Sequence, residues 1–350
     1  MIAIALFAFV CVAAAAVAVY VHMKKLKNSV TVPPIVIVVD AKVAAAINAA
    51  TLVTGYAPAS LSDFIAAADA AMVLYSLQTS ISDQVMINVG AAAGAAASDA
   101  SLVKNHTDRS LKAARDAASQ TVILYSTQNG ISIKVLIAMG IVAGAAASLA
   151  ALVTNSTEAS VKTVVDVAIA AAFDNKNDVN EQLTSENILL AIVFAAGAAA
   201  SKAYLVADST TVSVKAASDA ATAAVKLNSL NTDYTNAGLK AAGAAAGAAA
   251  AATVISLRTI GYVPDKQKGE IVLCIGPIAG KAAYATCIKL TPCRFDPTLL
   301  AAEAGQKAAA AALYYFFNHP HIYQSVEELY IGMTDVGKKS NDDFLLTTYC

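Results

Sequence analysis

Metal-ligating side chains gather at one place in the sequence, where His319 and His321 lie among tyrosines downstream of several cysteines. A zinc site would need two further ligands, which Cys274, Cys287 and Cys293 would have to supply. The thirteen- and six-residue spacings of these cysteines match no zinc-binding pattern. We therefore interpret the two histidines as exposed turn residues and predict no metal site.

Catalytic patterns are also missing from the sequence. The segment from Gly276 to Lys281 has the composition of a phosphate-binding loop, but its spacing is wrong and Pro277 removes a backbone amide that such a loop needs. The sequence contains neither the local signature of a nucleophile elbow nor a pair of histidines on one helix face. We predict that the protein is not an enzyme, and its sequence identifies no cofactor.

Cysteine usage indicates an oxidising compartment. Setting aside Cys11, which lies in the apolar N-terminal segment, leaves an even set, as expected for disulfides. The members of this set are Cys274, Cys287, Cys293 and Cys350. The sequence does not choose among their three possible pairings, and Cys350 could instead join two chains.

Two sequons agree with that compartment. Asn105-His-Thr107 and Asn155-Ser-Thr157 occupy corresponding places in successive segments, and we predict glycosylation at Asn105 and Asn155.

The N-terminal residues 2–21 carry no charge and precede Lys24, Lys25 and Lys27. We expect residues 1–18 to be a cleaved signal peptide and the protein to be secreted or extracellular. The alternative is a retained membrane anchor, since twenty apolar residues span a bilayer. Residues 19–41 contain Pro33 and Pro34 followed by a β-branched run, and we expect an extended arm there.

Composition excludes two classes of protein. With 57% hydrophobic and 14% charged residues, the chain is too apolar to be disordered. Its net charge of −1 and scattered cations exclude a nucleic-acid partner.

A run of small residues occurs four times and is typical of close helix packing. Residues four apart lie on one ridge of a helix, so a ridge of glycine and serine lets another backbone approach. The ridge positions are Gly90, Gly94, Ser98, Gly140, Gly144, Ser148, Gly197, Ser201, Gly243 and Gly247. We expect these residues to pack helices within one chain; the alternatives are self-association and a slot for an apolar ligand or lipid.

The segments between these runs predict helical hairpins. Leu-Val pairs that begin at residues 52, 102, 152 and 205 each end an alanine-rich segment. After the last three pairs a polar capping cluster follows, and a Lys and an Asp four residues apart come next. The spacing is fifty residues and then fifty-three, with the extra residues in a polar loop. Residues 42–260 thus predict an all-α array of about four alanine-rich αα-hairpin repeats with a period of about 50.

Residues 261–350 differ in composition and hold the four C-terminal cysteines. We expect a small cysteine-containing α+β C-terminal module there. Its strand would cover residues 269–275, and its main helix would cover residues 298–317 after Pro297.

The whole pattern favours a non-enzymatic, extracytoplasmic repeat protein with a structural or assembly role and with self-association. One alternative is a carrier that holds a lipid, pigment or other apolar ligand between its hairpins. A second is a membrane-anchored or multi-spanning scaffold or pore. Asp99, Lys202 and Lys240 argue against multiple spans, because each would cost a few kcal/mol at the centre of a bilayer. We therefore expect membrane contact only through the N-terminal segment, if that segment is retained.

Overall fold

A computed structural model describes residues 40–55, 57–76, 81–177, 185–230, 234–260, 265–290, 297–318, 335 and 337–339. The expected signal peptide and all but the last two residues of the expected arm lie outside these ranges, as do His319, His321, Cys293 and Cys350. Ala41, the last residue of that arm, already belongs to a helix.

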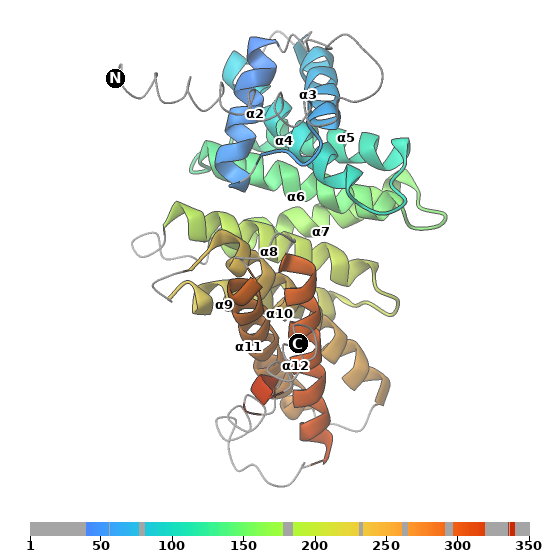
Figure 1. The fold of residues 1–350 in the computed structure, drawn as a ribbon. Helices are drawn as coiled ribbons and strands as arrows, with labels where there is room; N and C mark the ends of the chain where they lie inside the picture. The colour runs from blue at the N-terminus through green and yellow to red at the C-terminus, as the bar shows by residue number, and fades with distance from the viewer. Residues whose placement is uncertain are drawn as a thin grey trace, which may run out of the picture. The chain divides into compact units, whose positions relative to one another are not determined.

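The described chain is all-α, as the sequence predicts, and its described residues contain no strand. Consecutive helices pack as antiparallel neighbours (Figure 1). The helices are α2 (Ala41–Thr54), α3 (Leu61–Ser76), α4 (Asp83–Ser101), α5 (Asp108–Tyr125), α6 (Ile133–Ala151), α7 (Glu158–Asn177), α8 (Glu186–Leu205), α9 (Thr211–Asn228), α10 (Asn236–Ile260), α11 (Asp265–Leu290) and α12 (Pro297–Asn318).

Hydroxyl caps begin α5, α7 and α9. In each, a threonine side chain accepts a hydrogen bond from the amide of a serine three residues later, and that serine hydroxyl accepts from the amide of the threonine. The pairs are Thr107 with Ser110, Thr157 with Ser160, and Thr210 with Ser213. These bonds satisfy amides that have no partner inside the helix, so the polar clusters fix where the helices start.

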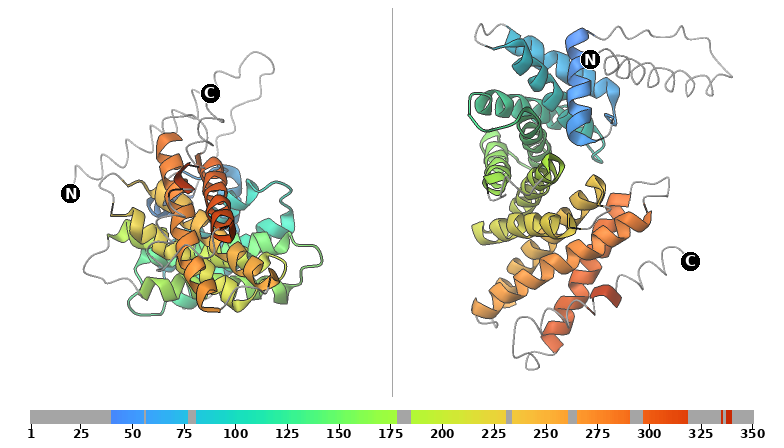
Figure 2. Two further views of the ribbon diagram at one scale, coloured as in Figure 1. Left: turned by 90° about the horizontal axis from the view of Figure 1, so that it is seen from below. Right: turned by 90° about the vertical axis from the view of Figure 1, so that its left-hand side faces the viewer.

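The even-numbered helices form a continuous row, because α2, α4, α6, α8, α10 and α12 each contact the next member of the series. The odd-numbered helices α5, α7, α9 and α11 each pack on the two row helices that flank them in sequence. The row continues to α12, and α10, α11 and α12 lie side by side, orange to red in Figure 2. Every row helix therefore packs against both a row neighbour and an odd-numbered neighbour.

Glycines set the spacing between these helices. A Cβ atom at Gly140 of α6 would lie 2.7 Å from the Cβ of Ala92 on α4 and 3.1 Å from the carbonyl oxygen of Ala118 on α5. At Gly305 of α12 it would lie 2.6 Å from the Cβ of Ala245 on α10 and 2.7 Å from the carbonyl oxygen of Ala279 on α11. In both cases the glycine packs on the backbone of the preceding helix and on an alanine of the helix before that.

The strand expected at residues 269–275 is wrong, because these residues lie inside α11. The β-branched residues and Gly276-Pro277 suggested a strand that breaks, but the apolar positions follow a helical stripe. Ile271, Cys274, Ile275 and Ile278 are all buried, at spacings of three, one and three residues. The described part of the C-terminal segment is therefore helical, and its expected helix at 298–317 is confirmed as α12.

Four of the described helical segments are long and apolar enough, by length and composition, to cross a membrane. They are Ile133–Ala151, Glu186–Leu205, Asn236–Thr259 and Glu270–Cys287. More than half of each segment is buried inside the protein. Packing against neighbouring helices therefore accounts for much of their apolar character.

Candidate functional site

A cavity of about 930 Å³ lies between α9, α10 and α11. Its apolar lining comes from Val212, Ala216, Ala220 and Ala223 of α9, Val254 and Leu257 of α10, and Val272, Leu273 and Pro277 of α11. The volume falls within the range of about 300–1,000 Å³ that is common for small-molecule sites. This cavity is the best candidate for a binding site in the described chain.

Sequence spacing explains the α9 wall of this cavity. Val212, Ala216, Ala220 and Ala223 are separated by four, four and three residues, so they share one face of the helix. Three of the four are alanines, whose short side chains leave the space beside them unfilled. On the opposite wall, a Cβ at Gly276 would lie 2.8 Å from the Cβ of Ala220, so α11 approaches α9 closely there.

The cavity opens to water through apolar side chains. Val212 and Leu273 line it and are 65% and 72% exposed, respectively. Exposed aliphatic side chains next to a hollow gain free energy when another apolar group covers them. The cavity is therefore suited to an apolar ligand.

Two charged residues line the cavity, Asp219 and Arg258. Asp219 is neutralised by Lys215, whose Nζ lies 3.0 Å from its Oδ2. Arg258, in the last turn of α10, is exposed, and within the described structure it makes no ion pair or hydrogen bond. The lining thus carries one uncompensated positive charge.

A separate polar cluster joins α2, α4, α8 and α10. The Nζ of Lys240 donates a hydrogen bond to the carbonyl oxygen of Thr54 at 3.2 Å and lies 4.4 Å from the ring centroid of Phe194. Burial raises the pKa of Asp99 from 3.8 to about 6, although the charge of Lys240 acts to lower it. Burial also lowers the pKa of Lys240 below its ordinary value. The cluster connects helices that are far apart in sequence, and we regard it as structural.

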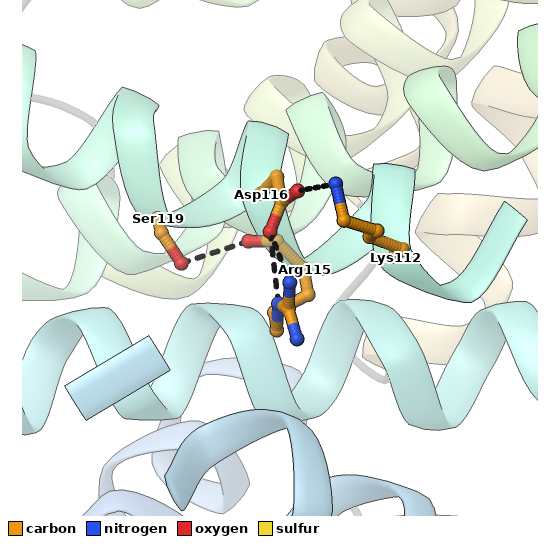
Figure 3. Close-up of polar contacts among 4 residues, drawn as sticks. All are labelled: Lys112, Arg115, Asp116 and Ser119. Atoms are coloured by element: carbon orange, nitrogen blue, oxygen red, sulfur yellow. Dashed lines mark hydrogen bonds and ion pairs between the residues drawn. The ribbon is translucent and has the colours of Figure 1, made fainter. Parts of the chain in front are cut away.

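The expected Lys–Asp pairs all form. Figure 3 shows the pair on α5, where Lys112 Nζ lies 3.1 Å from Asp116 Oδ2 and Arg115 donates to Asp116 Oδ1 from Nε at 2.8 Å and Nη2 at 2.7 Å. The hydroxyl of Ser119 donates to the carbonyl oxygen of Arg115 at 2.8 Å. The other pairs are Lys162 with Asp166 and Lys215 with Asp219. Such solvated pairs each contribute about 0.3–0.5 kcal/mol and form no pocket.

Backbone geometry accounts for the residue types of both sequons. Asn105 and Asn155 are exposed and have φ angles of 66° and 62°. Asp208, at the corresponding place before α9, has a φ of 63° and belongs to no sequon. After glycine, Asn and Asp are the residues that best tolerate this left-handed conformation, and the threonine two positions later is a helix cap. The turn therefore favours Asn-x-Thr whether or not a glycan is attached.

The ten ridge residues lie buried between helices of this one chain. A Cβ at Gly94 would lie 2.7 Å from the Phe64 ring of α3, and one at Gly247 would lie 2.9 Å from the carbonyl oxygen of Ala217. Ser98 accepts a hydrogen bond from the amide of Ser60 at 2.9 Å. The ridges are therefore occupied by intrachain packing, and their surface is not available to another chain.

Cys274 and Cys287 are both buried on α11, and no disulfide is present among the cysteines that the structure describes. Thirteen helical residues separate their Cα atoms by roughly 20 Å, well beyond the reach of a disulfide. Burial raises the pKa of the Cys274 thiol from 9.0 to about 11, which suppresses the reactive thiolate. The expected disulfides with Cys293 or Cys350 lie outside the described residues.

Within the described ranges, no three His, Cys, Asp or Glu side chains lie close enough together to hold a metal ion. Comparison of the chain with protein-family models, with curated proteins and with solved structures found no match. A function therefore has to be inferred from the residues of the chain itself.

Proposed function

We propose that this protein is a non-enzymatic helical repeat protein with a structural scaffold role. The observation that carries the proposal is the glycine contact shared by α6, α10 and α12, each of which packs on a carbonyl of the preceding helix and on an alanine of the helix before it. Such nearest-neighbour packing builds a long, rigid array from short units. The cap threonines Thr107, Thr157 and Thr210, spaced fifty and fifty-three residues apart, support a repeat unit of about 50 residues.

Self-association, the second part of this proposal, would use surfaces other than the buried ridges. Exposed aliphatic side chains recur at or just after the C-terminal ends of α2, α4, α6 and α8. They are Leu52, Leu102, Val153 and Val206, and they are 69%, 66%, 47% and 49% exposed. Repeated apolar side chains at one end of successive hairpins are the kind of surface that marks a protein contact.

Sedimentation velocity over a range of protein concentrations tests this assembly. We expect the wild type to associate and the double variant Leu102→Gln, Val153→Gln to stay monomeric. The matched control is Val73→Gln, Leu74→Gln, which changes two exposed residues at the end of α3, at the other end of the α3–α4 hairpin. A wild type that stays monomeric at high concentration would contradict the assembly role.

We propose secretion as the setting, with cleavage of residues 1–18 and glycans on Asn105 and Asn155. The exposure of both asparagines supports this. The N-terminal sequence of the mature protein tests it, because a chain that starts at Met1 would indicate a retained anchor.

A carrier of an apolar ligand is the second candidate, and the 930 Å³ cavity between α9, α10 and α11 favours it. An organic extract of the purified protein, analysed by absorption and mass spectrometry, tests it. A stoichiometric apolar compound is the expected result, and an extract without one from protein purified in mild conditions would count against a carrier.

A multi-spanning membrane protein is the third candidate, supported by the four helical segments of sufficient length and apolarity. Asp99 and Lys240 oppose it, because two partly buried charges would lie within or next to spanning segments. Protein lacking residues 1–18 should stay in solution without detergent, and sedimentation with membranes would reverse this ranking.

A further inference from the structure

We propose that the cavity between α9, α10 and α11 binds a long-chain carboxylate, with its apolar chain between α9 and α11 and its head group at Arg258. This inference rests on the carrier candidate and specifies its ligand. The chemistry of the cavity supplies each part of the specification.

The apolar residues of α9 and α11 that line the cavity indicate a hydrocarbon chain as the body of the ligand. Val212, Ala216 and Ala220 form one continuous face on α9, and Val272 and Leu273 face the same space from α11. These side chains offer no hydrogen-bond donor or acceptor to a ligand body. An unbranched hydrocarbon chain matches such a groove, whereas a sugar or nucleotide would leave its hydroxyls unpaired.

The head group is specified by the positive charge at one end. The antiparallel arrangement of α9 and α10 brings Arg258 near the end of α10 to the N-terminal end of α9, where Thr210 and Val212 also line the cavity. In α9 the amide of Ser213 is already bonded to the Thr210 hydroxyl, but the positive end of the helix dipole still favours an anion near this end of the helix. Arg258 and the N-terminal end of α9 therefore both give a positive potential to this end of the cavity.

The net charge of the cavity lining favours a ligand head group with a single negative charge. Lys215 already neutralises Asp219, so the lining retains a single positive charge. A carboxylate balances that charge, whereas a phosphate dianion would keep an excess negative charge and an alkyl ammonium would be repelled. Arginine also binds a carboxylate through two parallel hydrogen bonds.

Titration calorimetry with three probes of equal chain length tests the ligand class: palmitate, its uncharged methyl ester and hexadecylamine. We expect palmitate to bind in a 1:1 ratio, the ester at least roughly tenfold more weakly, and the amine most weakly, because the ester keeps the apolar contacts but loses the charge-assisted bonds to Arg258. Arg258→Gln should weaken palmitate to the affinity of the ester and leave the ester unchanged.

Two further variants separate the head group from the groove. Lys281→Gln removes the same charge from an exposed residue of α11 that does not line the cavity, and it should change no affinity. Ala216→Phe places a ring in the groove and should weaken palmitate and ester alike. Because Arg258 lies in the last turn of α10, circular dichroism of each variant checks that the helices are intact.

The outcomes distinguish the ligand class from the carrier function. Equal affinity of wild type for palmitate and its ester, or an unchanged palmitate affinity in Arg258→Gln, would overturn the carboxylate while leaving a carrier. Absence of binding by all three probes, together with an extract free of apolar compounds, would overturn both.

Discussion

Helices α6 and α11 use the same packing device in two different settings. Each has glycines four residues apart, Gly140 and Gly144 in one and Gly276 and Gly280 in the other. The glycines of α6 let it approach α4 and α5 closely, and nearly all of its middle turns are buried. Beside α11, the same device leaves a cavity against α9, with exposed Leu273 on its wall.

The comparison teaches that the glycine ridge sets the distance between helices but does not ensure that the space beside them is filled. On α6, residues such as Leu136 and Ile137 are buried around the ridge. On the facing side of α9 the residues are mostly alanines, and α11 contains Pro277. A ligand site therefore arises where the spacing is kept and the filling side chains are absent.

The largest expected effect on the free energy of unfolding comes from a substitution in the closely packed helix α6. In Gly144→Val the new Cβ would overlap the Cβ of Ala96 and lie 2.6 Å from the carbonyl oxygen of Ala114, so α6 must move away from α5. We expect a loss of about 4 kcal/mol in the free energy of unfolding, measured by urea denaturation.

Ala145→Val on the same helix is the control for valine itself, because Ala145 is only partly buried. Gly280→Val on α11 sharpens the comparison: its Cβ would lie 2.8 Å from the Cβ of Ala224 and 3.1 Å from the carbonyl oxygen of Ala242. We expect a smaller loss there, about 2–3 kcal/mol. Equal losses at Gly144 and Ala145 would refute the role of the ridge.

The second prediction concerns Asp99 and Lys240, the partly buried charges on the row helices α4 and α10. Since the pKa of Asp99 is raised from 3.8 to about 6, the folded state holds its proton more tightly than the unfolded state. The contribution of Asp99 is fully favourable below pH 4 and is lost as the pH rises through 6, a change of about 2–3 kcal/mol. Urea denaturation at pH 4 and pH 7 should show this loss in wild type relative to Asp99→Asn.

Lys240→Met provides a second measurement. Because the charge of Lys240 lowers the pKa of Asp99, its removal should raise that pKa further above 6 in an NMR titration of the Asp99 carboxyl. A pKa that falls in this variant would show that Lys240 is not the partner.

The third prediction concerns α11, the helix that borders the cavity. Pro277 has no amide hydrogen, so the carbonyl of Leu273 lacks its helical donor. Proline inside a helix costs about 3 kcal/mol, and its rigidity in the unfolded chain returns about 1 kcal/mol, so Pro277→Ala should stabilise the protein by about 2 kcal/mol. Hydrogen exchange should detect a protected amide at residue 277. An unchanged or lower free energy of unfolding would mean that α11 needs the proline.

The closely packed region around α6 and the cavity region around α11 also differ in how far the sequence predicts them. The helices α5 and α6 follow from the cap residues Thr107 and Ser110 and from the spacing of Gly140 and Gly144, all of which are local signals. The helical state of residues 269–275 was missed for two reasons. The β-branched residues favour a strand, and Pro277 disfavours a continuous helix, but tertiary packing overrides both preferences. The apolar stripe from Ile271 to Ile278 was the signal that could have corrected this.

The cavity could not be predicted in the same way. Its lining comes from α9, α10 and α11, and the contact between Ala220 and Gly276 joins residues 56 positions apart. No local sequence pattern predicts that these helices contact one another. The available hints were the alanine face of α9 and a lone Arg258 at the end of an apolar helix.

The smallest expected effect concerns the turns that separate the regular hairpins. Asn155 has a φ of 62°, and aspartate occupies the corresponding turn at residue 208 with a φ of 63°. Asn155→Asp should therefore change the free energy of unfolding by less than about 0.5 kcal/mol, whereas Asn155→Ala should lose about 1 kcal/mol, because alanine tolerates a left-handed backbone poorly. The aspartate variant also removes the sequon without disturbing the turn. In protein from a secreting cell, a mass decrease in Asn155→Asp, with stability unchanged, would show a glycan on Asn155, whereas equal stability of the alanine variant would show that the turn does not select the residue.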